Sequence, residues 1–247
     1  MTGSASSGIA VVTGAGGGIG SAVARRLSAD GYRVACVDVV AEAADATAGG
    51  LSDARAFRCD VSSAAEVDSL RTEIAKWDRG DVRLLVNVAG LFFEHSIVDL
   101  SEADWNRLIG VNLTGPFLTC RAFLPAMIAA GGGCVVNVAS TAGLRGSRNR
   151  AAYSAAKAGL VMLTRSLALD HGKDGIRVNC LCPGLIDTDM AAWIREDPAA
   201  LHRWEASTPA GRMGTPDEMA AAVSYLASPD ASYVQGTVLS ADGGVMA

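Results

Sequence analysis

The chain has 247 residues, of which half are hydrophobic and 19% are charged. This length and composition suit one globular domain with a sizeable core. The formal net charge is -5, and no basic stripe is present that would neutralise the phosphates of a nucleic acid. The N-terminus has no signal-peptide pattern, and no apolar run reaches the ~18–20 residues needed to span a bilayer. We therefore expect a cytoplasmic protein without nucleic-acid or membrane partners.

The cysteines and histidines do not form a metal-binding pattern. No Cys-x-x-Cys occurs, and the three histidines do not cluster with the cysteines. We predict buried reduced thiols and no metal site. The six cysteines are Cys36, Cys59, Cys120, Cys134, Cys180 and Cys182.

The first strongly patterned stretch combines a strand, a glycine-rich turn and a helix. The β-branched run Ile9–Thr13 predicts a buried parallel strand. It continues into Gly14-Ala-Gly-Gly-Gly-Ile-Gly20, and a helix is predicted from about Ser21 to Asp30. In this context backbone N–H groups can approach a pyrophosphate. The spacing is Thr-Gly-x-x-x-Gly-x-Gly rather than the strict Gly-x-Gly-x-x-Gly.

The next strand, Arg33–Val37, ends in Asp38. An acidic residue at this point accepts hydrogen bonds from the hydroxyls of the adenosine ribose, and it repels a 2′-phosphate. No Arg or Lys lies in the glycine loop or directly after Asp38. The sequence therefore favours NAD over NADP.

Strands and helices alternate along the rest of the chain. Further strands are predicted at Ala54–Cys59, Val82–Val88, Cys134–Ala139, Ile176–Leu181 and Val238–Leu239. Further helices are predicted at Ser63–Trp77, Glu102–Val111, Asn112–Ala130, Asn149–Arg165 and Pro216–Ala227, with Thr188–Thr208 irregular. This alternation predicts an α/β, three-layer Rossmann fold: a doubly wound parallel sheet of about seven strands with helices on both faces. We expect a single domain over residues 1–247, with ligands bound at the carboxyl ends of the strands.

The predicted helix Asn149–Arg165 carries Tyr153 and Lys157 one turn apart on the same face. A free phenol has a pKa near ~10 and is a poor base at neutral pH. A neighbouring ammonium favours the phenolate, which makes the tyrosine a usable acid/base. Such a pair alone is common in helices, so its weight depends on the motifs around it.

Taken together, the motifs resemble those of the short-chain dehydrogenase/reductase family, in its single-domain branch of about 250 residues. The resemblance covers essentially the whole chain. Its parts are Thr13–Gly20, Asp60, Asn87-Val88-Ala89-Gly90, Asn112, Ser140, Tyr153, Lys157, Asn179, Pro183-Gly184 and Thr188.

The resemblance implies a role for each of four catalytic residues. Tyr153 would be the acid/base, and Lys157 would lower the pKa of its phenol and hold the nicotinamide ribose. Ser140 would hydrogen-bond the reacting oxygen. Asn112 would anchor a water that links Lys157 to solvent.

The resemblance also implies a set of cofactor contacts. They are Gly14, Gly17, Gly18, Ile19, Gly20, Asp38, Asp60, Val61, Asn87, Ala89, Gly90, Tyr153, Lys157, Pro183, Gly184, Ile186 and Thr188. Val88 stands where the family usually has a second Asn, in a stretch that partly steadies the central sheet. This departure puts the bracing role in question more than catalysis.

The substrate residues are less well defined. The candidates are Ser140, Leu144, Arg150, Tyr153, Leu185 and Trp193, and residues 188–208 resemble the mobile substrate lid of the family. Arg145, Arg148 and Arg150 are candidates for binding an anionic group, or for a solvated loop or a subunit contact. Among them Arg150, three residues before Tyr153, is the first choice for a substrate contact.

These observations predict an NAD-dependent oxidoreductase that transfers a hydride between the nicotinamide and a small secondary alcohol or ketone. One alternative is a 3-oxoacyl-carrier-protein-type reductase that uses NADPH. An alternative of another class is a non-catalytic dinucleotide sensor. The resemblance further implies a homotetramer, assembled through the helix after Asn112 and the Tyr153 helix.

Overall fold

Seven parallel strands form one sheet in the order β3-β2-β1-β4-β5-β6-β7. The computed structural model describes residues 8–77 and 80–247. The strands are β1 (Ile9–Thr13), β2 (Arg33–Asp38), β3 (Ala54–Arg58), β4 (Val82–Asn87), β5 (Gly133–Val138), β6 (Ile176–Pro183) and β7 (Val238–Ala241). The predicted doubly wound Rossmann fold is confirmed.

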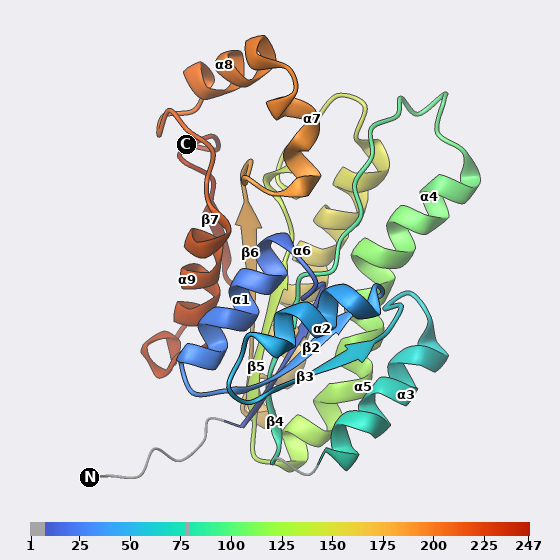
Figure 1. Cartoon of the computed structure of the whole chain (residues 1–247), viewed down its shortest axis with the longest axis vertical. Helices are drawn as coiled ribbons and strands as arrows, with labels where there is room; N and C mark the ends of the chain where they lie inside the picture. Colours follow the sequence, from blue (N-terminus) through green and yellow to red (C-terminus); the bar gives the residue numbers. More distant parts are fainter. Residues whose placement is uncertain (1–7, 78–79) are drawn as a thin grey trace.

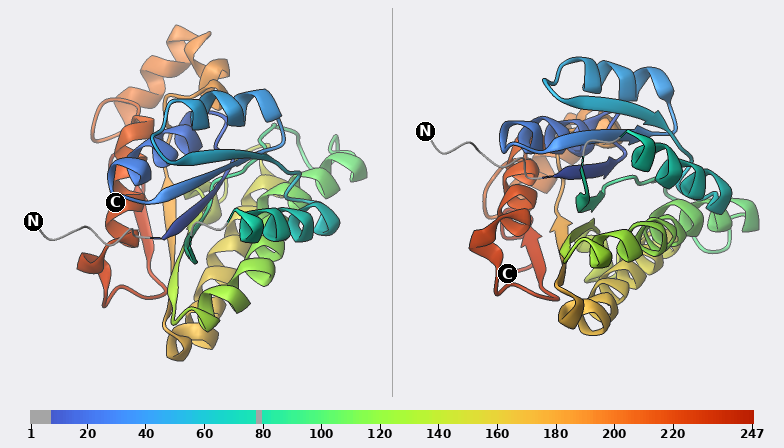
Figure 2. Two further views of the ribbon diagram at one scale, coloured as in Figure 1. Left: turned by 60° about the horizontal axis from the view of Figure 1, so that its bottom comes forward. Right: turned by 90° about the horizontal axis from the view of Figure 1, so that it is seen from below.

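Helices cover both faces of the sheet (Figure 1, Figure 2). They are α1 (Gly18–Ala29), α2 (Ala41–Gly49), α3 (Ala64–Lys76), α4 (Glu102–Ile109), α5 (Gly115–Ala129), α6 (Ala151–His171), α7 (Ala192–Arg195), α8 (Pro198–Ser207) and α9 (Pro216–Ala227). One apolar cluster joins the sheet to α1, α2 and α9, and a second joins it to α3, α5 and α6. In β2, for example, Val34 and Cys36 belong to the first cluster, whereas Ala35 and Val37 belong to the second. Burial on both faces explains why the strands are continuously apolar.

The strand order reverses between β1 and β4, which lie side by side although two strands separate them in sequence. The loops that leave these two strands diverge to opposite faces, which opens a crevice at their carboxyl ends. The glycine loop leaves β1 at this point, and Ala89 and Gly90 follow β4. The fold therefore places the two Gly-containing segments on either side of the expected ligand crevice.

Two stretches are more helical than predicted. Residues 41–49, for which no element was predicted, form α2, and the stretch 188–208 contains α7 and α8. Only Ala44 and Ala48 of α2 are buried, so no stripe of large apolar residues marks this helix. Helix α8 begins with a strong local signal, because Asp197 accepts hydrogen bonds from two backbone N–H groups and Pro198 follows it.

All six cysteines are buried free thiols, which confirms that prediction. Among the described residues, no group of three or more His, Cys, Asp or Glu side chains is placed to hold a metal ion. Within the same residues, no helix is long and apolar enough to cross a membrane.

Candidate active site

Helix α6 brings Tyr153 and Lys157 to the carboxyl ends of β5 and β6. Lys157 is 3% exposed, and its Nζ donates a hydrogen bond to the carbonyl of Val138, the last residue of β5, at 3.0 Å. The same Nζ lies 5.7 Å from the centre of the Tyr153 ring. Ser140 follows β5 after Ala139, and its hydroxyl is close enough to the Tyr153 phenol to lower the pKa of that phenol. The three side chains therefore lie close together at the carboxyl ends of β5 and β6.

Burial and neighbouring groups shift the pKa values of both Tyr153 and Lys157. Burial raises the pKa of the Tyr153 phenol, while the hydrogen bond from Ser140 and the positive charge of Arg150 lower it. Burial also lowers the pKa of Lys157 to about 8. The ammonium of Lys157 donates to the carbonyl of Val138, with its Nζ 5.7 Å from the centre of the Tyr153 ring. Arg150 is a further cation that favours the phenolate.

Asn112 lies in a π-helical turn, Gly110–Thr114, that joins α4 to α5 without a break. Its side chain is fully buried and donates to the carbonyls of Leu91 at 2.8 Å and Leu108 at 3.1 Å. Such turns interrupt the regular hydrogen-bond ladder and are frequent at functional sites. Asn112 thereby fixes the chain just after Gly90, close to Lys157.

Three adjoining hollows form a continuous track along the carboxyl edge of the sheet. The first contains Asp38 and Asp60, the second adds the glycine loop, and the third contains Ser140, Tyr153 and Lys157. The predicted cofactor residues that line the track are Gly14, Gly17, Gly18, Ile19, Asp38, Asp60, Val61, Ala89, Gly90, Tyr153, Lys157, Pro183, Gly184, Ile186 and Thr188. The predicted contacts therefore converge into one elongated site.

The track fits a dinucleotide at its centre. No side chain caps the amino end of α1 and no acidic residue lies in its first turn, so its positive end is open to an anion. Helices α3 and α4, by contrast, are capped by Ser63 and Ser101. A Cβ atom on Gly90 would lie 3.2 Å from Asn112 Oδ1 and 3.7 Å from Lys157 Nζ, so a side chain there would fill the track.

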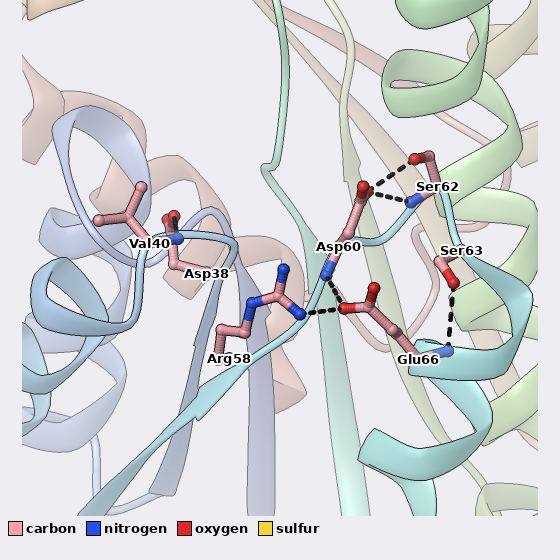
Figure 3. A network of polar contacts seen from close by, with 7 residues as sticks. All are labelled: Asp38, Val40, Arg58, Asp60, Ser62, Ser63 and Glu66. Carbon is pink, nitrogen blue, oxygen red and sulfur yellow. Dashed lines mark hydrogen bonds and ion pairs between the residues drawn. The ribbon is translucent and has the colours of Figure 1, made fainter.

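The adenosine end of the track is organised by carboxylates held by backbone N–H groups. Asp38 accepts hydrogen bonds from the N–H groups of Gly16 at 2.9 Å and Val40 at 3.0 Å. Asp60 accepts from the N–H and the hydroxyl of Ser62 at 2.9 and 2.6 Å (Figure 3). These bonds leave lone pairs on Asp38 for ribose hydroxyls, because each carboxylate oxygen can accept more than one hydrogen bond.

Two predicted cofactor residues serve the site indirectly. Asn87 is 2% exposed and donates to Asn137 Oδ1 at 2.9 Å, so its side chain braces β4 against β5 and does not line the track. Thr119 and Thr164 extend this buried chain into α5 and α6. The bracing therefore exists although Val88 replaces the usual Asn. A Cβ atom on Gly20 would lie 1.9 Å from the carbonyl oxygen of Gly14, so Gly20 permits α1 to pack on the loop.

Arg150 occupies one wall of the cavity around Tyr153. Its guanidinium forms an ion pair with Glu94 at 2.5 Å and lies 5.0 and 5.5 Å from the ring centres of Phe92 and Trp193. Ser140, Leu185 and Trp193 line the same cavity, whereas the predicted substrate residue Leu144 does not. Arg145 and Arg148 are exposed outside the cavity lining.

Sequence reasoning missed Glu94 as the partner of Arg150 and Met190 as a cavity residue. Glu94 lies in a loop without periodic pattern, and the fold alone brings that loop beside Asn149, whose carbonyl accepts the N–H of His95 at 2.9 Å. Met190 lies in the stretch predicted to be irregular. Without a predicted helix in that stretch, the sequence could not show which of its residues face the cavity.

Comparison with known proteins agrees with the fold. The family described as "Enoyl-(Acyl carrier protein) reductase" matches residues 14–246. The meso-2,3-butanediol dehydrogenase of Serratia marcescens is 39% identical over 97% of this chain and 94% of that protein. The galactitol 2-dehydrogenase (L-tagatose-forming) of Cereibacter sphaeroides is 40% identical over 95% of this chain and 93% of its own.

The crystal structure of a putative NAD(P)-dependent gluconate 5-dehydrogenase from Beutenbergia cavernae, described with bound NADP at low occupancy, superposes with a TM-score of 0.90. It is 38% identical and covers 98% of both chains. Similarity of this extent over nearly the whole length agrees with the motifs and with the strand order. The chain therefore belongs to the short-chain dehydrogenase/reductase family, as an oxidoreductase of alcohols or ketones.

Proposed function

We propose that the protein is an NAD-dependent dehydrogenase/reductase that interconverts a small secondary alcohol and the corresponding ketone. The observation that carries this proposal is the meeting of Ser140, Tyr153 and Lys157 at one end of a track whose other end holds Asp38. An acid/base and a dinucleotide site in one crevice are what this reaction requires.

The bound dinucleotide supplies or accepts the hydride. The glycine loop and the open end of α1 would hold its pyrophosphate, and Lys157 its nicotinamide ribose. The phenol oxygen of Tyr153 gives its proton to the carbonyl oxygen during reduction and takes the proton from the alcohol during oxidation. Ser140 orients that oxygen. The π-helical turn at Asn112 supports its assignment as the anchor of a water between Lys157 and solvent.

The preference for NAD rests on Asp38. Its carboxylate faces the adenosine hollow, and the glycine loop contains no basic residue. A 2′-phosphate placed there would meet an unfavourable like charge. A ribose with free hydroxyls would instead donate hydrogen bonds to the same carboxylate.

The substrate cavity favours a small neutral hydroxylated compound. Phe92, Leu185 and Trp193 supply apolar wall. Of the cations in the lining, Lys157 donates to the carbonyl of Val138, and the guanidinium of Arg150 is paired with Glu94. An anionic substrate would have to displace Glu94 from the guanidinium, whereas an alcohol can donate to one partner and accept from the other. Butanediol and galactitol, named for two relatives, are compounds of this neutral class.

The two alternatives make different predictions. A 3-oxoacyl-carrier-protein-type reductase requires NADPH and turnover of a thioester substrate. A dinucleotide sensor binds the cofactor but turns over no substrate, and the intact Ser140–Tyr153–Lys157 set speaks against it because a sensor needs no acid/base.

The direct test is a screen of diols, polyols and secondary alcohols with NAD at alkaline pH, with Tyr153→Phe as the control. We expect turnover by the wild type, and a loss of about 10²–10⁴-fold in kcat for Tyr153→Phe with NADH binding retained. Equal turnover by both proteins would remove Tyr153 from the mechanism.

We also propose that α7 and α8 form the substrate lid and that the chain assembles as a tetramer through α5 and α6. Met190 and Trp193 reach the cavity from the lid segment. Phe117 of α5 and Leu169 of α6 are large apolar side chains exposed by 44% and 83%. Leu160 of α6, by contrast, is buried inside the subunit. Sedimentation that detects only monomer would contradict the assembly.

A further inference from the structure

A basic residue stands beside Asp38 in the structure, although none follows it in the sequence. Arg58, the last residue of β3, is the parallel-sheet partner of Asp38, the last residue of β2. Paired residues on neighbouring strands lie about 4.8 Å apart and project to the same face. On that face Ala54 and Ala56 of β3 pack against the cluster formed with α1 and α2. Arg58 therefore lies beside the carboxylate that we assign to the adenosine ribose.

The guanidinium of Arg58 is held by Glu66. Its Nη1 donates to Glu66 Oε2 at 2.7 Å, and the same oxygen accepts the backbone N–H of Asp60 at 2.9 Å. In Figure 3 the guanidinium points toward Glu66, on the side away from Asp38. Within the part of the chain that the structure describes, neither Nε nor Nη2 of Arg58 makes a hydrogen bond. The residue thus has donors free for a ligand.

The bond between Arg58 and Glu66 is weak enough to exchange. The two side chains are 55% and 37% exposed, and ion pairs of this exposure add little to stability. A phosphate monoester carries nearly two negative charges and three acceptor oxygens, so it competes well with a single carboxylate for a guanidinium. Rotation of the flexible Arg58 side chain away from Glu66 would bring its charge toward the ribose position next to Asp38.

We propose that Arg58 and Glu66 form a charge pair that sets the choice between NAD and NADP. While the ion pair is intact, Glu66 neutralises the charge of Arg58. The negative charge of Asp38 then dominates at the ribose position, which favours NAD. When Arg58 is released, it pairs with the 2′-phosphate and offsets the repulsion from Asp38. This inference rests on the proposed dinucleotide site and adds to it a specificity-determining pair outside the glycine loop.

The other charged groups around the adenosine hollow are Asp60 and Arg107. The carboxylate of Asp60 accepts hydrogen bonds from the backbone N–H and the hydroxyl of Ser62. Arg107 projects from α4 and lines the hollow together with Val111. It is therefore the competing candidate for a phosphate contact, and the test must separate it from Arg58.

The test is a fluorescence titration of purified variants with NADH and NADPH, with thermal unfolding as a check of the fold. Glu66→Gln removes the charge but keeps an oxygen that can accept the N–H of Asp60. We expect it to tighten NADPH binding by about fivefold relative to NADH. Arg58→Gln should weaken NADPH binding several-fold and leave NADH unchanged, and the double variant should behave like Arg58→Gln.

Asp81→Asn is the matched control. It removes one carboxylate from another exposed ion pair, with Arg83 at 3.4 Å, at the opposite end of the sheet. We expect no change in the ratio of NADH to NADPH affinity. The inference is wrong if Glu66→Gln changes this ratio no more than the control, or if Arg107→Gln rather than Arg58→Gln loses NADPH. A wild type that binds neither dinucleotide would instead contradict the proposed function itself.

Discussion

At the scale of single residues, the surroundings of Tyr153 determine when it can accept a proton. Burial opposes the charged phenolate, so the pKa of the free phenol is raised, and Ser140 and Arg150 counteract this effect. The sequence predicted the Tyr153 and Lys157 pair because helical spacing places them on one face. It did not reveal the influence of Arg150, because that depends on how Glu94, Phe92 and Trp193 hold the guanidinium.

Replacing Arg150 by Gln should move the pH dependence of alcohol oxidation to higher pH. The positive charge lowers the pKa of the Tyr153 phenol, so its removal raises that pKa and the base appears only at higher pH. In a plot of kcat/KM against pH, we expect the rising limb to move to higher pH by about 0.5–1 unit. Arg148→Gln, on the exposed part of the same loop, is the control. An unshifted limb in Arg150→Gln would contradict this role.

Lys157 should make the folded protein less stable at neutral pH than at alkaline pH. Its pKa is about 8 in the folded chain, against 10.5 for a lysine in water, a difference worth about 3 kcal/mol. Between these values the unfolded chain binds more protons at this residue, so stability rises with pH across the window. Below pH 8 the full cost is present.

The comparison of wild type with Lys157→Met isolates this effect, because other titrating groups cancel. In denaturant unfolding without dinucleotide, the wild type should gain stability relative to the variant between about pH 8 and pH 10.5. If the difference in stability between the wild type and Lys157→Met is the same at both ends of this window, folding does not lower the pKa of Lys157.

At the scale of elements, a buried polar chain ties the sheet to the helices that carry the site. Asn137 of β5 accepts from Asn87 and donates to Thr164 of α6 at 2.9 Å, and Thr119 of α5 donates to Asn87 at 2.7 Å. Because α6 also carries Tyr153, this chain fixes the catalytic helix on the central strands. The sequence placed Asn87 at a strand end but did not show its partners, which lie 32 or more residues away.

Asn137→Ala should lower the free energy of unfolding by about 2–4 kcal/mol, because it leaves the buried amide of Asn87 with only the weak sulfur acceptor of Cys120. Asn106→Ala, on the exposed surface of α4, should change it by less than about 0.5 kcal/mol. Both are measured by denaturant unfolding. Similar values for the two variants would mean that the polar chain contributes nothing specific.

At the scale of the whole molecule, most of the site could be predicted because a parallel sheet brings its strand ends together. Gly14, Asp38, Asp60 and Ser140 lie at the carboxyl ends of different strands, and each lines the predicted crevice. What the sequence left open are contacts between side chains of different elements and loops. The pairing of Arg58 with Glu66 is of this kind: Arg58 has the sequence pattern of an ordinary strand residue, and only the strand register places it next to Asp38.

The most direct test of the proposed function is a titration of the purified protein with NADH and with NADPH, followed by fluorescence. We predict that NADH binds at least about tenfold more tightly, which corresponds to about 1.4 kcal/mol. Tighter binding of NADPH would contradict the role of Asp38 and favour the acyl-carrier-protein-type reductase. Binding of neither dinucleotide would contradict the assignment of the track along the sheet as a cofactor site.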